Sequence, residues 1–190
     1  MKSFVLATKN PNKIKEMQNI FKDYQIEILP PKEGFNPEEN GTTFEENSFI
    51  KAKEAAIISK KPALSDDSGL VIEALDGDPG IHSARFAETN EKRIQKVLDL
   101  LKNQPNKKAK FVCVMTFVNE NGEIIFQSKG ECHGEITNSP QGTEGFGYDP
   151  IFFIPEKNKT MAELSLEEKN QISHRALALK EMISKIINQK

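Results

Sequence analysis

The sequence has no tryptophan, only two cysteines, and no long uninterrupted apolar run. Cys113 and Cys132 form no Cys-x-x-Cys pair and suggest no disulfide framework, and Cys113 falls in an apolar run typical of a core. Cys132 and His133 are adjacent potential metal ligands, but two residues do not make a zinc site. No segment approaches the roughly 20 apolar residues of a membrane span, and MKSFVLATKN lacks the features of a signal peptide. We therefore expect a soluble, cytoplasmic protein that does not bind membranes.

The sequence also lacks an excess of basic residues. It has 26 lysines and arginines against 28 aspartates and glutamates, a formal net charge of −2. Proteins that hold DNA or RNA non-specifically are usually clearly basic, so nucleic acid is not an expected partner. The 190 residues, 37% of them hydrophobic, suffice for a sizeable core, and no repeat or long linker divides them. We predict a single domain over residues 1–190.

The apolar pattern predicts alternating strands and helices. The predicted strands lie at 3–8, 110–118 and 123–136, with two more within 62–75 that are separated at Ser68-Gly69. The predicted helices begin at Asn10, Thr43, about 89 and Ser165, and the last buries Ile172, Ala176, Leu179, Ile183 and Ile186. Residues 110–118 are apolar on both faces, which is typical of the middle of a sheet. Glycine- and proline-rich loops are expected at 29–43 and 138–150. This order predicts an α/β or α+β fold with a mixed sheet.

The stretch LATKNPNK, residues 6–13, joins the first predicted strand to the first helix. Asn10 is a good N-cap and Pro11 a good first helical residue. A helix N-terminus offers N–H groups and a partial positive charge, and Lys13 adds a full charge. The junction could therefore hold a triphosphate without the glycines of a P-loop. A capped surface helix with solvated lysines explains the same residues, and both interpretations are open at this point.

The stretch SDDSG places two carboxylates, Asp66 and Asp67, side by side at a predicted strand end. Such a pair is costly unless a cation lies nearby, and a divalent metal is the usual partner of hard oxygen ligands. Successive side chains of a strand point to opposite faces, so one carboxylate could serve a metal or water and the other a supporting network. An ordinary turn rich in aspartate is an equally open alternative.

Two later stretches carry groups suited to a planar ring. In GFGYDP, Phe146 or Tyr148 could stack on a ring, and Asp149 could accept hydrogen bonds from it or from a ribose. A glycine-rich turn with inward aromatics is the alternative. Lys169 and His174 would lie roughly 140° apart on one continuous helix. A ligand shared by both would require the chain to turn between them; otherwise they form a solvated helix edge.

Together these stretches resemble the inosine triphosphate pyrophosphatase family, also called Ham1-like or RdgB-like, almost from end to end. The resemblance rests on Thr8, Asn10 and Lys13 and on TFEENSFIKAKEAA, ALSDDSGL, DPGIHSARF, GFGYDPIFF and AELSLEEKNQISHRALAL. It implies an α/β fold in which a mixed twisted sheet with flanking helices forms two lobes around a central cleft, and a homodimer. It also implies Mg2+-dependent hydrolysis of ITP, dITP and XTP to the monophosphate and pyrophosphate, which removes deaminated purines from the nucleotide pool.

The resemblance further implies roles for individual residues. Asp67 would be catalytic, activating the water that attacks the α-phosphorus, and would bind the metal with Glu39, for which Glu38 is the alternative. The implied substrate-binding residues are Thr8, Lys9, Asn10, Pro11, Asn12, Lys13, Lys51, Asp66, Ser68, Phe146, Gly147, Tyr148, Asp149, Lys169, His174 and Arg175. The segment 146–149 would form the base pocket, and the last three residues would read the 6-oxo edge of hypoxanthine or xanthine. Arg85 lies near another substrate-contact region of the family.

Three rival interpretations come from other classes. A Maf-like nucleotide pyrophosphatase would act on other nucleotides, such as modified pyrimidine triphosphates, but GFGYDP and the SHR segment argue against it. A nucleotide sensor that does not hydrolyse would not need the base, so Asp66, Asp67 and Lys13 argue against that reading. A nucleic-acid-binding module is disfavoured by the charge balance and by the lack of a basic stripe with exposed aromatics.

Overall fold

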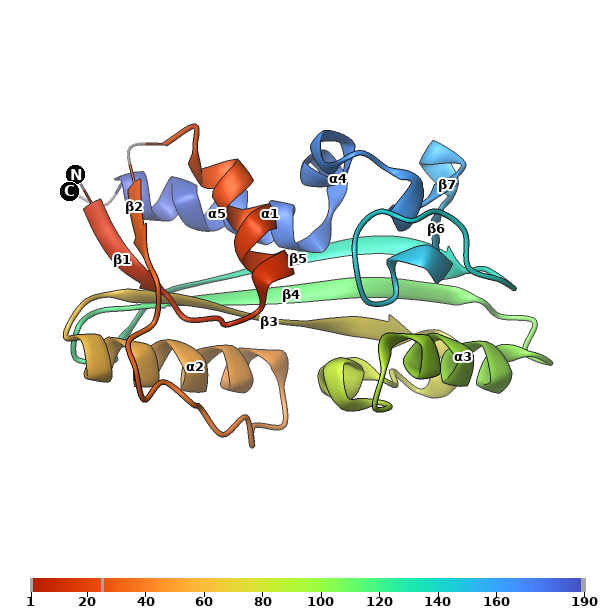
Figure 1. Ribbon diagram of the computed structural model, residues 1–190, viewed down its shortest axis with the longest axis horizontal. Helices are drawn as coiled ribbons and strands as arrows, with labels where there is room; N and C mark the ends of the chain where they lie inside the picture. Colours follow the sequence, from red (N-terminus) through yellow and green to blue (C-terminus); the bar gives the residue numbers. More distant parts are fainter. Residues whose placement is uncertain (1, 25, 189–190) are drawn as a thin grey trace. The chain divides into compact units, whose positions relative to one another are not determined.

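The computed structural model describes residues 2–24 and 26–188 and contains one mixed sheet (Figure 1). The strands are β1 (Lys2–Leu6), β2 (Ile26–Leu29), β3 (Ala63–Ile72), β4 (Lys108–Val118), β5 (Ile124–Ile136), β6 (Phe152–Ile154) and β7 (Lys159–Thr160). Their order is β2-β1-β3-β4-β5-β6-β7, which places β4 in the middle and confirms the prediction for 110–118. β1 pairs in parallel with β2 and β3, whereas β6 pairs antiparallel with β5 and β7. The predicted mixed sheet of an α/β fold is thus confirmed.

The helices flank this sheet. The α-helices are α1 (Pro11–Phe21), α2 (Phe44–Ser59), α3 (Asn90–Leu101), α4 (Leu166–Ile172) and α5 (His174–Asn188). Short 3-10 helices are η1 (Glu73–Leu75), η2 (Gly80–Arg85), η3 (Asp149–Ile151), η4 (Pro155–Lys157) and η5 (Met161–Glu163). None of the helices in the described ranges has the length and apolar character needed to cross a membrane.

The chain divides into two compact units. Unit 1 comprises Met1–Asp67, Cys113–Gly130 and His174–Lys190, and unit 2 comprises Ser68–Val112 and Glu131–Ser173. The boundary in β3 falls directly after Asp67, so the two halves of the SDDSG stretch belong to different units. That residues 1–190 act as a single family domain stays a prediction.

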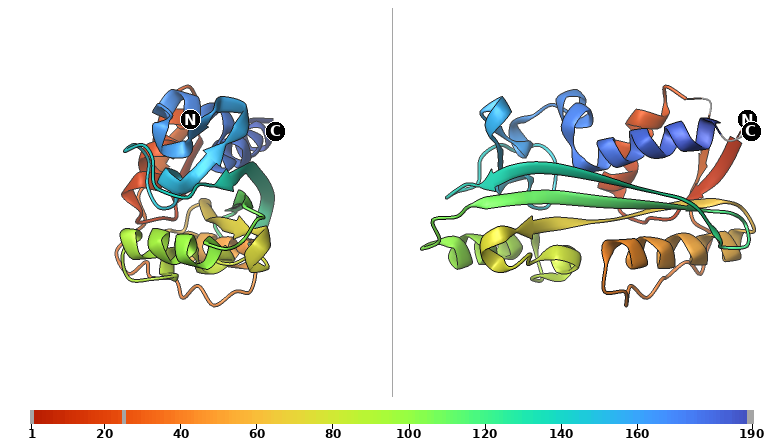
Figure 2. Two further views of the ribbon diagram at one scale, coloured as in Figure 1. Left: turned by 90° about the vertical axis from the view of Figure 1, so that its right-hand side faces the viewer. Right: turned by 180° about the vertical axis from the view of Figure 1, so that it is seen from behind.

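Unit 1 has a core on each face of its strands. Alternation along β1 directs Phe4 and Leu6 into a core with α1 and α5, and Val5 and Ala7 into a second core with α2. Accordingly, α1 and α5 lie on one face of these strands and α2 lies on the other (Figures 1 and 2). The second core is lined by alanines of α2, which let that helix pack closely on the sheet. Because β1 is buried on both faces, its end holds the residues of the following junction in a fixed place.

Unit 2 has its own core, which supports the loop between β5 and β6. The side chains of Leu70, Val97 and Phe111 pack there with Phe152, whose ring centroid lies 4.4 Å from that of Phe111. Within this unit, α3 and α4 lie on opposite sides of the strands (Figure 2). The loop that carries GFGYDP is anchored to this core by Tyr148, which is buried.

Three predicted helix starts are confirmed by their caps. The Asn10 side chain accepts hydrogen bonds from the backbone N–H groups of Asn12 and Lys13, and Pro11 is the first residue of α1. Thr43 caps α2 through Glu46 N–H. Ser165 and Glu168 form a complete capping box at α4, in which each side chain accepts a backbone N–H of the other residue.

Two sequence-based predictions were wrong. Strand β3 is continuous through Ser68-Gly69 rather than broken there. Gly69 serves close packing instead of a turn, because a Cβ at that position would lie 2.2 Å from the Gly80 carbonyl oxygen and 2.6 Å from Ser83 Oγ. Ile172 belongs to α4 and not to the helix of Ala176, since Ser173 adopts an extended conformation between them. The short strands β2, β6 and β7 also lie in segments for which no strand was predicted.

Candidate active site

The β1–α1 junction presents a capped helix N-terminus. Thr8 Oγ1 accepts a hydrogen bond from Asn10 N–H at 3.2 Å, and Asn10 Oδ1 accepts two from the first turn of α1. With its Oδ1 accepting from the helix, the Asn10 side chain can offer its Nδ2 as a donor to a ligand. Pro11 and Asn12 are exposed at the helix start. Lys9 is also exposed, and its ammonium lies 5.7 Å from the centroid of the Phe35 ring. The junction therefore joins backbone N–H groups to side-chain donors, a combination suited to an anion.

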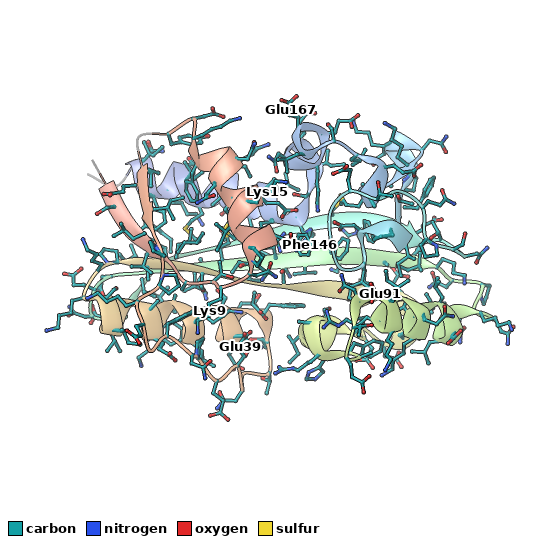
Figure 3. All side chains as sticks on the ribbon, viewed as in Figure 1. Lys9, Lys15, Glu39, Glu91, Phe146 and Glu167 are labelled. Atoms are coloured by element: carbon teal, nitrogen blue, oxygen red, sulfur yellow. The ribbon has the colours of Figure 1, made fainter. Side chains whose placement is uncertain are left out.

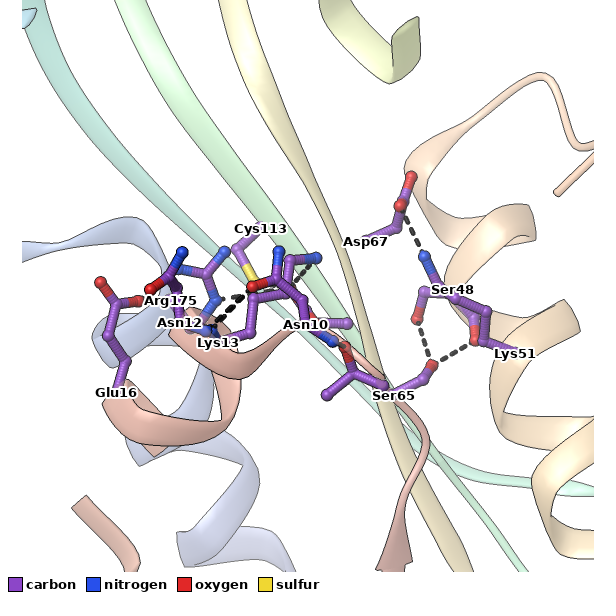
Figure 4. Close-up of polar contacts among 12 residues, drawn as sticks. Asn10, Asn12, Lys13, Glu16, Ser48, Lys51, Ser65, Asp67, Cys113 and Arg175 are labelled. Atoms are coloured by element: carbon purple, nitrogen blue, oxygen red, sulfur yellow. Dashed lines mark hydrogen bonds and ion pairs between the residues drawn. The ribbon is translucent and has the colours of Figure 1, made fainter. Parts of the chain in front are cut away.

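Asp66 is the centre of a buried ion network in unit 1. Its Oδ2 lies 2.8 Å from Lys13 Nζ and 3.4 Å from Arg175 Nε. Arg175 also forms an ion pair with Glu16, and Cys113 Sγ lies 4.0 Å from Asp66 Oδ2. Figure 4 shows Lys13, Arg175 and Glu16 gathered on one side of β3. Asp66 thereby holds Lys13 at the start of α1.

Asp67 lies in a second group, with Lys51 of α2 and Glu39 of the loop before α2. Lys51 Nζ is 2.7 Å from Asp67 Oδ1 and 2.7 Å from Glu39 Oε2. Figure 4 shows Asp67 and Lys51 on the side of β3 opposite Lys13, and Figure 3 shows Glu39 near the amino-terminal end of α2. Because Lys51 binds the carboxylates of both Glu39 and Asp67, Glu39 is favoured over Glu38 as the second metal-associated carboxylate.

The two aspartates differ in acidity because their surroundings differ. Burial alone would raise the pKa of Asp66, but Lys13, Arg175 and Lys51 hold that pKa well below its usual range. Burial raises the pKa of Asp67 to about 6, and the charge of Lys51 offsets only part of this rise. Burial would lower the pKa of Lys51, but Asp67, Asp66 and Glu39 raise it above its ordinary value. At neutral pH Asp66 is a fixed anion, whereas Asp67 can take up a proton near physiological pH.

Asp67 has an oxygen available for a divalent metal, but the described protein side chains around it are too few to form a complete metal site. Asp67 Oδ2 and Asp66 Oδ1 are buried and have no hydrogen-bond partner among the residues that the structure describes. Within the same residues, however, no cluster of three or more acidic, histidine or cysteine side chains could hold a metal ion. Mg2+ is usually bound by one or two protein carboxylates together with substrate phosphates and waters. Asp67 and Glu39 match that mode, in which the substrate completes the coordination.

A third group lies in unit 2, in the loop before η3. Asp149 Oδ2 accepts hydrogen bonds from Lys169 Nζ at 2.6 Å and from Phe146 N–H at 2.8 Å. The Lys169 ammonium lies 4.9 Å from the centroid of the Phe146 ring. Gly145 permits this approach, because its φ is 76° and a Cβ there would lie 2.1 Å from Asp149 Oδ2. The structure thus brings Asp149 and Lys169 together beside Phe146, whose half-buried ring is labelled in Figure 3.

The structure separates the two aromatic candidates of this loop. Tyr148 is buried, its hydroxyl donates to the Ser83 carbonyl oxygen at 3.0 Å, and burial raises its pKa to about 12. Tyr148 is therefore a structural anchor, and Phe146 is the ring that remains for stacking. Gly147 has a φ of 64°, a left-handed conformation that favours glycine.

The remaining predicted residues are divided between the units. His174 and Arg175 begin α5 in unit 1, whereas Lys169 and Ser68 belong to unit 2. The chain does turn between Lys169 and His174, at Ser173. Arg175 is buried against Asp66 and Glu16, so its described contacts are with the network around Lys13. Arg85 is exposed in η2, and His133 is exposed beside the buried Cys132.

The sequence analysis missed Glu16. This carboxylate lies one turn after Lys13 on α1, is 6% exposed, and pairs with Arg175. A signal was present, since Glu16 stands directly before Met17 on the apolar face of α1, where a carboxylate needs a partner.

The mixed α/β fold, the capped helix N-terminus and the two lysine–carboxylate groups define a class of protein suited to binding phosphate esters. The chain belongs to the Ham1 family, whose sequence pattern matches residues 4–185. It is 42% identical to a dITP/XTP pyrophosphatase of Synechocystis sp., over 96% of this chain and 94% of that protein. It is 44% identical to a dITP/XTP pyrophosphatase of Aquifex aeolicus, over 97% and 96% respectively. A HAM1 protein from Coxiella burnetii has a solved structure with a TM-score of 0.90 and 43% identity, and each chain is covered completely.

Proposed function

We propose that this protein is a hydrolase, a nucleoside-triphosphate diphosphatase that converts dITP, XTP and ITP to the monophosphate and pyrophosphate. Membership of the Ham1 family and the names of the relatives support the substrate class. The structural observation that carries the proposal is the buried Asp67, which lies 2.7 Å from Lys51 and has its pKa raised to about 6. A base with this pKa is mostly deprotonated at neutral pH and still basic enough to accept a proton from the attacking water.

In this proposal the residues of unit 1 handle the triphosphate. The N–H groups of the α1 start, Asn10 and Lys13 bind phosphate oxygens, and Lys51 neutralises charge that develops on the departing pyrophosphate. Asp67 accepts the proton of the water that attacks the α-phosphorus. Asp66 remains ionised and keeps the Lys13 ammonium in place, 2.8 Å from its Oδ2.

Asp67 and Glu39 are the residues that would hold Mg2+. When bound, the metal would neutralise phosphate charge and lower the pKa of a coordinated water. Lys51 bridges both carboxylates at 2.7 Å, so this chain keeps them close together before the metal and the substrate arrive.

The residues of unit 2 would recognise the base. Phe146 stacks on the purine, and Lys169 donates a hydrogen bond to a 6-oxo group. Adenine offers a 6-amino donor at that edge, and leaving such a buried group unpaired costs roughly 1–3 kcal/mol. This difference corresponds to a discrimination of about 5- to 150-fold. Tyr148, Asp149 and Gly147 shape the loop that presents the Phe146 ring.

The proposal is tested by pyrophosphate release from dITP, XTP, ITP, dATP, dGTP and dTTP, with Mg2+ and with EDTA controls. Fast metal-dependent turnover of the first three and slow turnover of dATP and dTTP is the expected result. Because guanine shares the 6-oxo group, the rate with dGTP shows whether a further feature of the site rejects its 2-amino group. Nucleotide binding without turnover would instead favour a sensor, and turnover confined to modified pyrimidine triphosphates would favour a Maf-like activity. A homodimer, a cytoplasmic location and the absence of a nucleic-acid partner belong to the same proposal.

A further inference from the structure

The loop that carries Glu39 is fastened to α2 by several side chains of that helix. Lys51 binds the Glu39 carboxylate, and Glu46 Oε2 accepts hydrogen bonds from the N–H and the hydroxyl of Thr42. Between these contacts, Asn47 Oδ1 accepts the N–H of Gly41 at 2.9 Å. Asn47 lies four residues, about one turn, before Lys51, so both side chains leave the same face of α2. Helix α2 therefore determines where this loop lies.

Asn47 is the most deeply buried of the three, with 1% of its surface exposed against 7% for Lys51, whereas Glu46 is exposed. Its amide orientation is set by chemistry, since Gly41 N–H can only donate and must face the oxygen. Its Nδ2 then faces away and has no acceptor within 2–24 and 26–188. A buried donor without a partner destabilises the fold. Retaining an amide here needs a reason other than stability.

Gly41 fits against Asn47 so closely that no side chain is tolerated. A Cβ on Gly41 would lie 2.8 Å from Asn47 Oδ1 and 2.7 Å from Glu46 Cβ. Glu39 is only two residues away, and Asn40 N–H donates to the Glu38 carbonyl oxygen at 2.9 Å in the intervening turn. Two residues of chain span at most about 7 Å. The position of Gly41 therefore limits where the Glu39 carboxylate can lie.

We propose that Asn47 is a positioning residue that holds the Glu39 carboxylate beside Asp67 for a divalent cation. The inference rests on the proposed function and adds a residue to it. The Glu39 side chain is 37% exposed and sits on a loop, so its ion pair with Lys51 holds it less firmly once a cation competes for the same oxygens. The Asn47–Gly41 hydrogen bond keeps the loop in place when the carboxylate turns from Lys51 to the cation.

Two variants remove this contact from opposite sides. Asn47→Ala deletes the acceptor, and Gly41→Ala pushes the half-buried loop away while leaving Asn47 intact. Glu54→Ala is the matched control, because Glu54 is a further α2 side chain that accepts a backbone N–H of the same loop, from Asn36 at 2.7 Å. Asn36 lies five residues before Gly41, on the far side of Glu39.

The first readout is Mn2+ affinity without nucleotide, followed by the electron paramagnetic resonance signal of free Mn2+. The Mn2+ binding that is lost in Asp67→Asn is the binding that belongs to this site. We expect Asn47→Ala and Gly41→Ala each to weaken Mn2+ binding about tenfold, as loss of an outer partner of a metal ligand typically does. Glu54→Ala should bind Mn2+ like the parent. The Mn2+ concentration for half-maximal turnover should rise in parallel, with kcat largely recovered at saturating Mn2+.

Parent-like Mn2+ affinity in both variants would overturn the proposal, as would equal weakening in Glu54→Ala. Parent protein that binds Mn2+ no better than Asp67→Asn would overturn it as well. If Asn47→Ala does not fold, as judged by its thermal midpoint, Gly41→Ala decides the question. A parent protein that binds Mn2+ through Asp67 but hydrolyses none of the nucleotides would refute the proposed function alone, because the Mn2+ comparison still reports on Asn47.

Discussion

Asp66 and Asp67 are neighbours in β3, yet their carboxylates bind different lysines. Asp66 contacts Lys13 of α1 at 2.8 Å, and Asp67 contacts Lys51 of α2 at 2.7 Å. The alternation of a strand sends adjacent side chains to opposite faces, where α1 and α2 lie. One dipeptide thus supplies a permanent anion and a carboxylate that can exchange a proton.

Asp67→Asn should abolish most of the turnover while nucleotide binding is retained. The amide keeps the shape of the carboxylate but cannot accept a proton, and loss of a general base typically costs 10²–10⁴-fold in rate, as an order of magnitude. The measurement is kcat for XTP together with the dissociation constant of XTP in Ca2+. Glu45→Gln, an exposed change in the first turn of α2, is the control and should be parent-like. Hydrolysis of XTP by Asp67→Asn at the parent rate would show that another group is the base.

The pH dependence of kcat/KM should report the Asp67 carboxyl of the free enzyme. Burial raises its pKa to about 6, so below pH 6 the carboxyl is protonated and cannot act as a base. We expect kcat/KM to rise about tenfold per pH unit between pH 4.5 and 5.5 and to level off above pH 7. The profile should be recorded at constant metal and ionic strength. A profile that is flat between pH 5 and 8 contradicts the assignment of Asp67.

Asp66 should contribute stability that disappears in acid. Its folded-state pKa is depressed by Lys13 and Arg175, so its contribution is complete above its unfolded pKa, about 3.9. The contribution is lost as the pH falls from there through the lower folded-state pKa. Asp66→Asn removes the carboxylate that pairs with Lys13 and one of the two that pair with the buried Arg175, and breaking such a buried pair typically costs about 3–5 kcal/mol.

The test is urea unfolding of the parent and Asp66→Asn at pH 7 and at pH 2.5. The difference in the free energy of unfolding should be several kcal/mol at pH 7, on the order given for broken buried pairs, and should shrink at pH 2.5. Asp78→Asn, an exposed change in unit 2, serves as the control. An equal difference at both pH values would mean that shape, and not charge, makes Asp66 important.

Much of the fold could be predicted because its signals are local. The N-caps Asn10, Thr43 and Ser165 act within one helical turn, and the double apolar face of 110–118 is visible in the strand itself. Gly69 misled the prediction because its reason is tertiary: it makes room for Gly80 and Ser83, which are distant in sequence.

The candidate site likewise has some residues that local sequence patterns indicated and some contacts that only the folded chain forms. Residue types and spacing indicated Lys13, the two aspartates and the GFGYDP loop, because charge and glycine patterns are visible in the chain. The partners could not be predicted from composition or spacing, since the pairing of Arg175 with Glu16 joins residues 159 positions apart. The choice of Glu39 over Glu38 likewise depends on which side chain reaches Lys51, and only the folded loop decides that.

Phe146 and Tyr148 should respond differently to substitution, although both belong to one short loop. Phe146 is half-buried with Lys169 over its ring, whereas Tyr148 is buried and bonded to Ser83. Phe146→Ala should raise KM for XTP by about 5- to 150-fold, the equivalent of a stacking contribution of about 1–3 kcal/mol. Tyr148→Phe should leave KM unchanged and lower the free energy of unfolding by about 1 kcal/mol, the net value of one hydrogen bond. Steady-state kinetics and urea unfolding on both variants separate the two roles. An unchanged KM in Phe146→Ala would show that the Phe146 ring does not stack on the base, and a raised KM in Tyr148→Phe with unchanged stability would mean that the Tyr148 hydroxyl acts on the substrate and not on Ser83.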